Sequence, residues 1–117
     1  MQIQLNTDNH LVGSKDLALQ LEGEVRVALG RFADQITRVE VHLNDLNSDK
    51  AGGDDKRCMM EARVAGRQPM SVSHEAPTVI LAIEGASDKL ARALDRIFGK
   101  LDAGRRSGAR QTNDDAT

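Results

Sequence analysis

Strict alternation of apolar and polar residues predicts four β-strands in this chain. In the clearest case Val39, Val41 and Leu43 share one side of the strand, while the residues between them are polar. Such a strand has one buried face and one face in water. The four predicted strands span residues 2–7, 36–44, 57–65 and 70–74. A polar loop over 45–55 and a turn at 66–68 join the last three into a meander.

Apolar residues spaced three and four apart predict two amphipathic helices. Ser14 is a suitable N-cap for the first, which runs to about Phe32, and Gly30 is a candidate for its end. Pro77 suits the first turn of the second helix, and Gly104 is expected to end it. Each helix has one apolar stripe, formed by Leu17, Leu21, Val25, Ala28, Leu29 and Phe32 in the first and by Ile83, Leu90, Leu94, Ile97 and Leu101 in the second.

The element order β-α-β-β-β-α predicts an α+β fold. The first helix is a crossover that makes the first two strands parallel, and the last three strands are antiparallel neighbours. We expect a two-layer sandwich, in which both helices are packed on one face of a four-stranded mixed sheet. The domain is expected to cover residues 1–103. Residues 104–117 lack large apolar side chains and are expected to form a disordered polar tail.

The composition restricts the kinds of partner. Only 2% of the 117 residues are aromatic, so recognition of bases by stacking on aromatic platforms is almost excluded. The net charge is −2, so a polyanion would have to bind a local basic patch. No apolar run is long enough to span a bilayer, and no signal-peptide pattern is present. We therefore expect a soluble cytoplasmic protein without a membrane partner.

Groups suited to catalysis or metal binding do not assemble in the sequence. His10, His42 and His74 lie on separate predicted elements, without metal-ligand spacing. Cys58 falls on the apolar side of its strand, which favours a buried, unreactive thiol over a nucleophile. No nucleophile, base and orienting group come together. We expect a protein that is not an enzyme and has no metal, cofactor or small-molecule substrate.

The loop after the second predicted strand begins like a calcium-binding loop. Asp45, Asn47 and Asp49 match its first three side-chain ligands. The later positions fail, because Lys50 and Lys56 stand where a glycine and a bidentate glutamate are needed. We interpret the segment as an acidic hairpin connection.

The second predicted helix carries the main candidate surface. One side holds a row of cations that extends over about 17 Å, at roughly 1.5 Å per residue, namely Lys89, Arg92, Arg96 and Lys100. The other side holds Glu84, Asp88, Asp95 and Asp102. A row of cations can follow a phosphate backbone, and an arginine can donate two N–H groups to one phosphate. An ordinary solvated helix face has the same pattern, so the helix alone leaves both interpretations open.

Three segments, together with the element order, resemble a known family. They cover residues 35–43, 58–64 and 82–94, and the most specific part is the Asp-Lys-Leu-Ala-Arg run at 88–92. The chain resembles, over residues 1–102, the ribosome hibernation-promoting factors and ribosome-associated inhibitors, also called sigma-54 modulation proteins. Members have the β-α-β-β-β-α fold. Long members add a C-terminal dimerisation domain, and we expect this chain to be a short member.

The resemblance implies a partner, the small ribosomal subunit. Members bind it in the mRNA–tRNA channel, contact 16S rRNA through basic residues, and block translation in stationary or stressed bacterial cells. Lys89 and Arg92 match the family motif directly, and Arg96 and Lys100 fit by position. The other basic residues expected to support RNA binding are Arg26, Arg31, Arg38 and Arg63.

The chain departs from the family pattern in two places. Val25 and Ala28 lie in the part of the first helix where members carry lysines, and Asp95 and Phe98 dilute the basic end of the second helix. These departures leave a second hypothesis open. The same fold can serve as a protein-interaction module, as a stress-regulator partner or a homodimer, with reduced or lost RNA binding. Met59 on the outer face and the free edge of the first or fourth strand would then form the docking surface.

Overall fold

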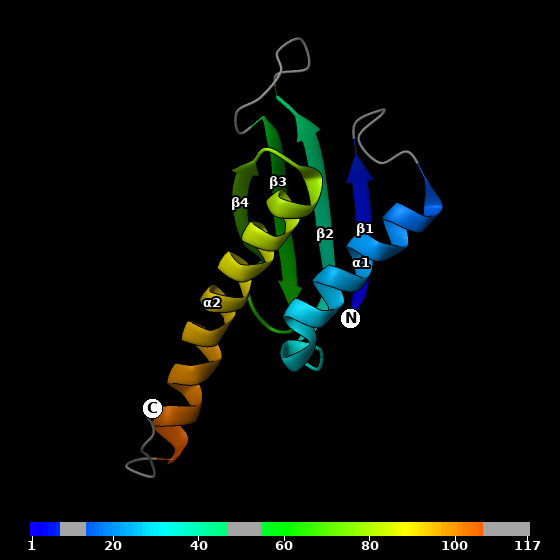
Figure 1. Ribbon diagram of the computed structural model, residues 1–117. Coiled ribbons are helices and arrows are strands. Elements are labelled where there is room, and N and C mark those ends of the chain that lie inside the picture. The colour runs from blue at the N-terminus through cyan, green and yellow to red at the C-terminus, as the bar shows by residue number, and fades with distance from the viewer. Residues whose placement is uncertain (8–13, 47–54, 107–117) are drawn as a thin grey trace.

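A computed structural model describes the backbone of residues 1–7, 14–46 and 55–106, and the side chains as far as residue 99. The elements follow the predicted order β-α-β-β-β-α (Figure 1). They are β1 (Gln2–Thr7), α1 (Lys15–Leu29), the 3-10 turn η1 (Gly30–Phe32), β2 (Ile36–Asp45), β3 (Lys56–Val64), β4 (Met70–Ala76) and α2 (Val79–Arg106). His10, residues 107–117 of the predicted tail, and Asn47, Asp49 and Lys50 of the loop that begins like a calcium site lie outside the described residues.

The four strands form one mixed sheet in the order β1-β2-β3-β4. As predicted, β1 and β2 are parallel, whereas β2–β3 and β3–β4 are antiparallel. Both helices lie in front of the same face of this sheet, and the C-terminal part of α2 extends beyond the sheet at the lower left (Figure 1). The α+β sandwich of two layers is therefore confirmed. Neither of the two described helices covers the other face of the sheet.

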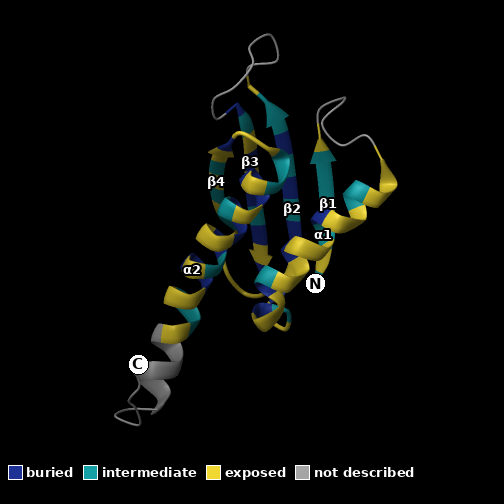
Figure 2. Cartoon of the chain, in the orientation of Figure 1, coloured by how far each residue is buried: buried dark blue, intermediate teal, exposed yellow. Residues whose placement is uncertain are grey.

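The core fills the space between the two layers (Figure 2). The alternation predicted for β2 and β3 is confirmed, because Val39, Val41 and Leu43 are buried beside Met60 and Ala62. The polar residues between them point to the open face. Cys58 is fully buried, as predicted, and its burial raises the pKa of the thiol to about 12.

The ends of α1 agree with the predictions, whereas α2 differs at both of its ends. The predicted N-cap is confirmed by Ser14 Oγ, which accepts a hydrogen bond from the Leu17 amide at 3.1 Å. The α-helical part of α1 ends at Leu29 with Gly30 as its C-cap, as predicted, and residues 30–32 tighten into η1. At the start of α2, Pro77 lies outside the helix. Thr78 is the N-cap, because its Oγ1 accepts from the Leu81 amide at 3.1 Å.

The second difference is that α2 passes through Gly104 and continues to Arg106. The prediction that this glycine ends the helix was wrong. A glycine inside a helix costs about 1 kcal/mol relative to alanine, and this cost alone does not stop a helix.

Two glycines have conformations or contacts that a larger residue would disturb. Gly66 has a φ of 73° in the predicted turn between β3 and β4, and glycine adopts this left-handed conformation without strain. Gly85 lies in α2 where the helix passes over β4. A Cβ atom at this position would lie 2.0 Å from Cδ2 of His74. His74 is half-buried, and its ring fills the space that Gly85 leaves.

Candidate nucleic-acid interface

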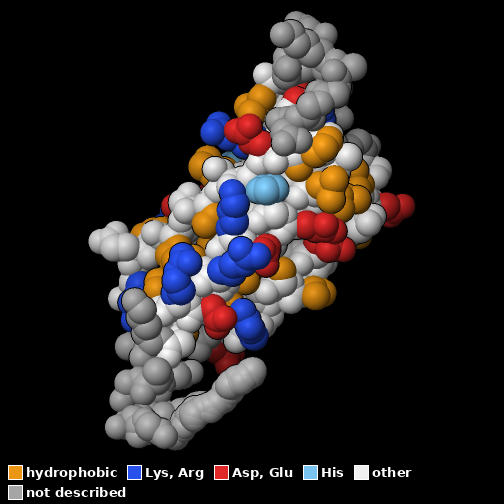
Figure 3. Space-filling view, turned by 60° about the vertical axis from the view of Figure 1, so that its left-hand side comes forward, with side chains coloured by type: hydrophobic (Ala, Val, Ile, Leu, Met, Phe, Trp, Pro, Cys, Tyr) orange, Lys and Arg blue, Asp and Glu red, His pale blue; other side chains and the backbone are white. Residues whose placement is uncertain are grey.

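The outer side of α2 presents the row of cations that the sequence predicts. Buried Ile83, Leu90 and Leu94 fix the rotation of the helix on the sheet, so residues on the opposite arc face the solvent. Lys89, Arg92 and Arg96 are exposed there, and we call these three residues the α2 ridge. Figure 3 shows lysine and arginine side chains gathered on this face of the molecule, with acidic side chains among them. The side chain of Lys100, the fourth predicted cation, lies outside the described part of the chain.

Lys89 joins the α2 ridge to the edge of the sheet. Its Nζ donates a hydrogen bond to the backbone carbonyl of Ser73 in β4, at 2.9 Å. An ammonium group has three N–H donors, so two remain for water or for a ligand. The contact holds the end of a flexible side chain at one place on the surface.

Arg92 is paired with a carboxylate on its own helix. Its Nη2 lies 2.5 Å from Oδ2 of Asp88, one turn earlier, and both side chains are exposed. Pairs of this kind contribute only about 0.3–0.5 kcal/mol, because water screens them and the side chains lose entropy. A phosphate can therefore compete for the guanidinium, but Asp88 lowers the positive charge of the α2 ridge.

Arg96 has no carboxylate within 4.0 Å among the described side chains. A further cation, Arg67, comes close to the same half of α2 from the turn between β3 and β4. Its guanidinium lies 5.9 Å from the ring centroid of Phe98, and it too lacks an ion pair within the described residues. The sequence analysis missed Arg67 because it treated residues 66–68 only as a turn.

The cations predicted on α1 lie at two different places. Arg31, just after α1, pairs with Asp95 of α2 at 3.4 Å and lies over the ring of Phe32. It therefore links the C-terminal end of α1 to the middle of α2. Arg26 donates to the backbone carbonyl of Met1 at 3.3 Å, which places it beside the start of β1. The structure does not bring Arg26 to the α2 ridge.

The two cations predicted on the sheet lie on the open face, on the other side of the sheet from both helices. Arg38 and Arg63 are neighbours in the β2–β3 register, and both pair with Glu40, at 2.8 and 3.9 Å. Arg63 also lies 3.9 Å from Glu61, and Arg38 donates to the side chain of Gln4. These carboxylates neutralise much of the charge. The seven predicted cations whose side chains are described are thus distributed over two faces of the molecule and the β1 side.

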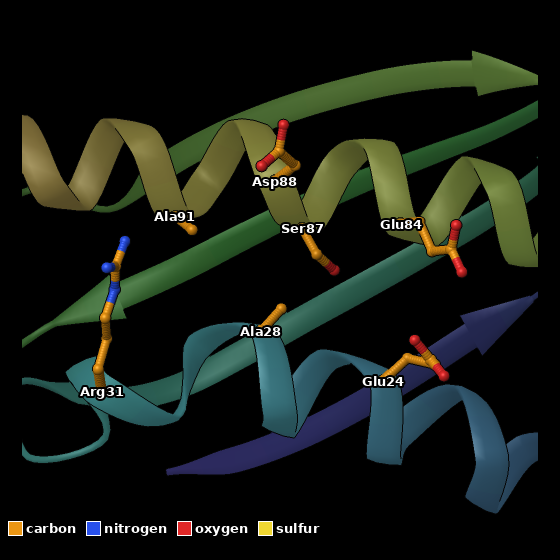
Figure 4. Close-up of a pocket in the computed structure, with 7 residues that line it drawn as sticks. All are labelled: Glu24, Ala28, Arg31, Glu84, Ser87, Asp88 and Ala91. Carbon is orange, nitrogen blue, oxygen red and sulfur yellow. The ribbon is translucent and has the colours of Figure 1, made fainter.

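The groove between α1 and α2 is mainly acidic, in contrast to the α2 ridge (Figure 4). It has a volume of about 310 Å³, and Glu24, Glu84 and Asp88 line it together with Arg31 and Ser87. The side chain of Glu24 comes from α1 and that of Glu84 from α2, and both reach into the space between the helices (Figure 4). Carboxylates repel phosphate, so a nucleic acid would contact α2 from its outer side rather than enter this groove.

The described residues include no cluster of three or more His, Cys, Asp or Glu side chains that could hold a metal ion. Within the same residues, no helix is long and apolar enough to cross a membrane.

Comparisons with known proteins agree with this fold. The N-terminal domain of Protein Y from Thermus thermophilus has 20% sequence identity and a TM-score of 0.65, with 83% of this chain and 99% of that chain covered. A ribosomal subunit interface protein from Coxiella burnetii has 15% identity and the same TM-score, with 85% and 99% covered. None of the curated proteins compared with this chain matches it significantly.

A family model gives the stronger assignment, because it matches the sequence itself over most of its length. The matched region, residues 7–102, includes all of α1, the last three strands and the α2 ridge. The chain therefore belongs to the sigma 54 modulation protein / S30EA ribosomal protein family.

Proposed function

We propose that this protein binds the small ribosomal subunit through 16S rRNA, in the mRNA–tRNA channel, and blocks translation under stress or in stationary phase. It would act in the cytoplasm, where its partner is. Membership of the S30EA family supports a ribosomal partner. The observation that carries the proposal is the α2 ridge, where Lys89 is anchored on β4 and Arg96 has no described acidic partner.

The number of exposed cations on and beside the α2 ridge sets the expected strength of binding. Lys89, Arg92, Arg96 and Arg67 give about four phosphate contacts, and a protein that neutralises Z phosphates has a slope of log K against log salt between about −0.7Z and −0.9Z. The expected slope is therefore about −3. This value is small for a nucleic-acid-binding protein, and it agrees with the net charge of −2.

The proposed mechanism is occlusion and requires no catalysis. A folded domain that occupies the channel competes with mRNA and tRNA by mass action, so inhibition follows the fraction of subunits that carry the protein. The rigid placement of α2 on the sheet fixes the spacing of its cations before binding. Such preorganisation lowers the entropy lost when the complex forms.

Co-sedimentation with purified 30S subunits through sucrose, at low and moderate salt, tests the proposal. The wild-type protein should migrate with the subunit at low salt and less at higher salt. The double variant Arg92→Glu/Arg96→Glu should lose this co-migration. Lys15→Glu/Arg57→Glu is the matched control, since it changes the charge equally at exposed positions away from the α2 ridge. If the wild-type protein stays at the top of the gradient even at low salt, the proposal is wrong.

A second candidate function, a protein-interaction module, has specific support on α1. Leu19 and Val27 are 65% and 86% exposed on the outer side of this helix, one helical turn on either side of Gly23. Four of the eight predicted RNA-binding cations are also paired with carboxylates, namely Arg31, Arg38, Arg63 and Arg92. A pull-down that recovers one specific protein and no ribosomes would select this function over the first.

A further inference from the structure

The fourth strand leaves one side of its backbone without a neighbouring strand. It is last in the sheet order, and among the strands that the structure describes it pairs only with β3. In an antiparallel ladder the N–H and C=O of one residue point to the same side, and the side alternates along the strand. The Leu46 amide donates to the Asp55 carbonyl where β2 and β3 meet, so the backbone groups of the odd-numbered residues of β3 face β2 and those of its even-numbered residues face β4. The even-numbered residues pair with Met70, Val72, His74 and Ala76, so the free side belongs to Ser71, Ser73 and Glu75, and the Ser73 carbonyl on this side accepts from Lys89. Free edges of this kind can pair with another chain.

The sequence of this edge is complementary to itself. If a second copy pairs antiparallel with β4 around Ser73, its Glu75 lies opposite Ser71, and each Ser73 lies opposite its equivalent. A hydroxyl donor then faces a carboxylate acceptor at both ends, and no charged residue of the edge faces its equivalent. No proline interrupts Met70–Ala76. The same patch on both copies would meet, as a two-fold symmetric dimer requires.

Lys89 stands in the way of this pairing. Its ammonium binds the carbonyl of Ser73, the middle residue of β4, and this carbonyl would be needed by the second copy. Two-fold symmetry about Ser73 would also bring the two ammonium groups towards each other, and like charges repel. We propose that the edge of β4 is a self-pairing surface for a second copy of this chain, and that Lys89 keeps it closed. Lysines commonly protect sheet edges in this way.

The test compares the mass in solution of three variants with that of the wild-type protein by sedimentation equilibrium, from about 10 μM to about 1 mM protein. A salt concentration of about 0.5 M screens the repulsion between the other cations on α2. The wild-type protein should remain a monomer, and Lys89→Ala should approach the mass of two chains as its concentration rises. Arg96→Ala, which removes a cation from the same ridge without touching β4, should remain a monomer.

Adding Ser73→Pro to Lys89→Ala removes an N–H from the free edge, and proline is tolerated on edge strands at such positions. This double variant should return to the monomer mass. Amide hydrogen exchange gives a second readout, because the amides of Ser71, Ser73 and Glu75 in Lys89→Ala should become protected as the concentration rises. A monomeric Lys89→Ala protein at every concentration would overturn the proposal. Association without protection of these three amides would overturn it as well.

Discussion

The close contact between Gly85 and His74 gives a prediction about how α2 is held on the sheet. A Cβ atom on residue 85 would lie 2.0, 2.3 and 2.4 Å from Cδ2, Nε2 and Cγ of His74. Real contacts of this kind lie beyond 3.0 Å, so Gly85→Ala forces the imidazole ring or the helix to move. Overpacking of this kind costs about 1–3 kcal/mol. Alanine in place of glycine stabilises a helix by about 1 kcal/mol, so the net loss is about 1 kcal/mol.

In a protein that lacks the imidazole ring of residue 74, Gly85→Ala should stabilise the fold instead of destabilising it. In His74→Ala the space in front of Gly85 is empty, and adding Gly85→Ala should then raise the stability by about 1 kcal/mol. The two effects of the same substitution differ by about 2 kcal/mol, which is the coupling energy of the pair.

Urea unfolding of the wild-type protein, the two single variants and the double variant measures this coupling. In thermal unfolding, 1 kcal/mol corresponds to a change in Tm of roughly 4 °C for a domain of this size. If Gly85→Ala changes the free energy of unfolding equally in both backgrounds, the ring does not occupy the place of the missing Cβ. The reasoning about how α2 is positioned would then be refuted.

Three further predictions concern single residues. Asp88→Asn removes the ion-pair partner of Arg92 and should strengthen binding to 30S subunits by about two-fold, roughly 0.3–0.5 kcal/mol, as a titration at low salt can measure. Cys58 should react with a thiol reagent only after unfolding. The free energy of unfolding should fall as pH rises above about 9, because the thiol of the unfolded chain ionises near its ordinary pKa of 9.0, whereas burial raises the pKa of the folded thiol to about 12. Ser14→Ala removes the N-cap of α1 and should lower the free energy of unfolding by about 1 kcal/mol in urea.

The fold could be predicted because its signals are local and repeated. Alternation in β2 and β3 determines which side chains enter the core, and the crossover rule determines that β1 and β2 are parallel. The ends of α2 were harder to predict, because single residues decide them. Thr78 caps the helix with one hydroxyl, and the backbone remains helical past Gly104. Neither fact follows from periodicity.

The candidate site could be predicted only where it lies on one helix. The spacing of Lys89, Arg92 and Arg96 is enough to place them on one side of α2. The partners from other elements could not be predicted, since Arg31–Asp95 and Lys89–Ser73 join residues far apart in sequence. The open-face position of Arg38 did follow from the alternation of β2, and this should have separated it from the α2 ridge.

Element lengths contained a signal for Arg67 that the sequence analysis did not use. The seven residues of β4 span roughly 23 Å at about 3.3 Å each. About fifteen residues of α2, at roughly 1.5 Å each, cover the same distance on the way back. The turn between β3 and β4 therefore lies level with the middle of α2, and the contact of Arg67 with Phe98 agrees with this position.

Binding to 30S subunits as a function of salt tests most directly whether the α2 ridge is an rRNA-binding surface. The wild-type protein should show a slope of log K against log salt of about −3, and Arg92→Glu/Arg96→Glu should reduce it to about −1.5 or abolish binding. Lys15→Glu/Arg57→Glu should keep the wild-type slope. Equal slopes and affinities for the wild-type protein and the Arg92→Glu/Arg96→Glu variant would contradict the account.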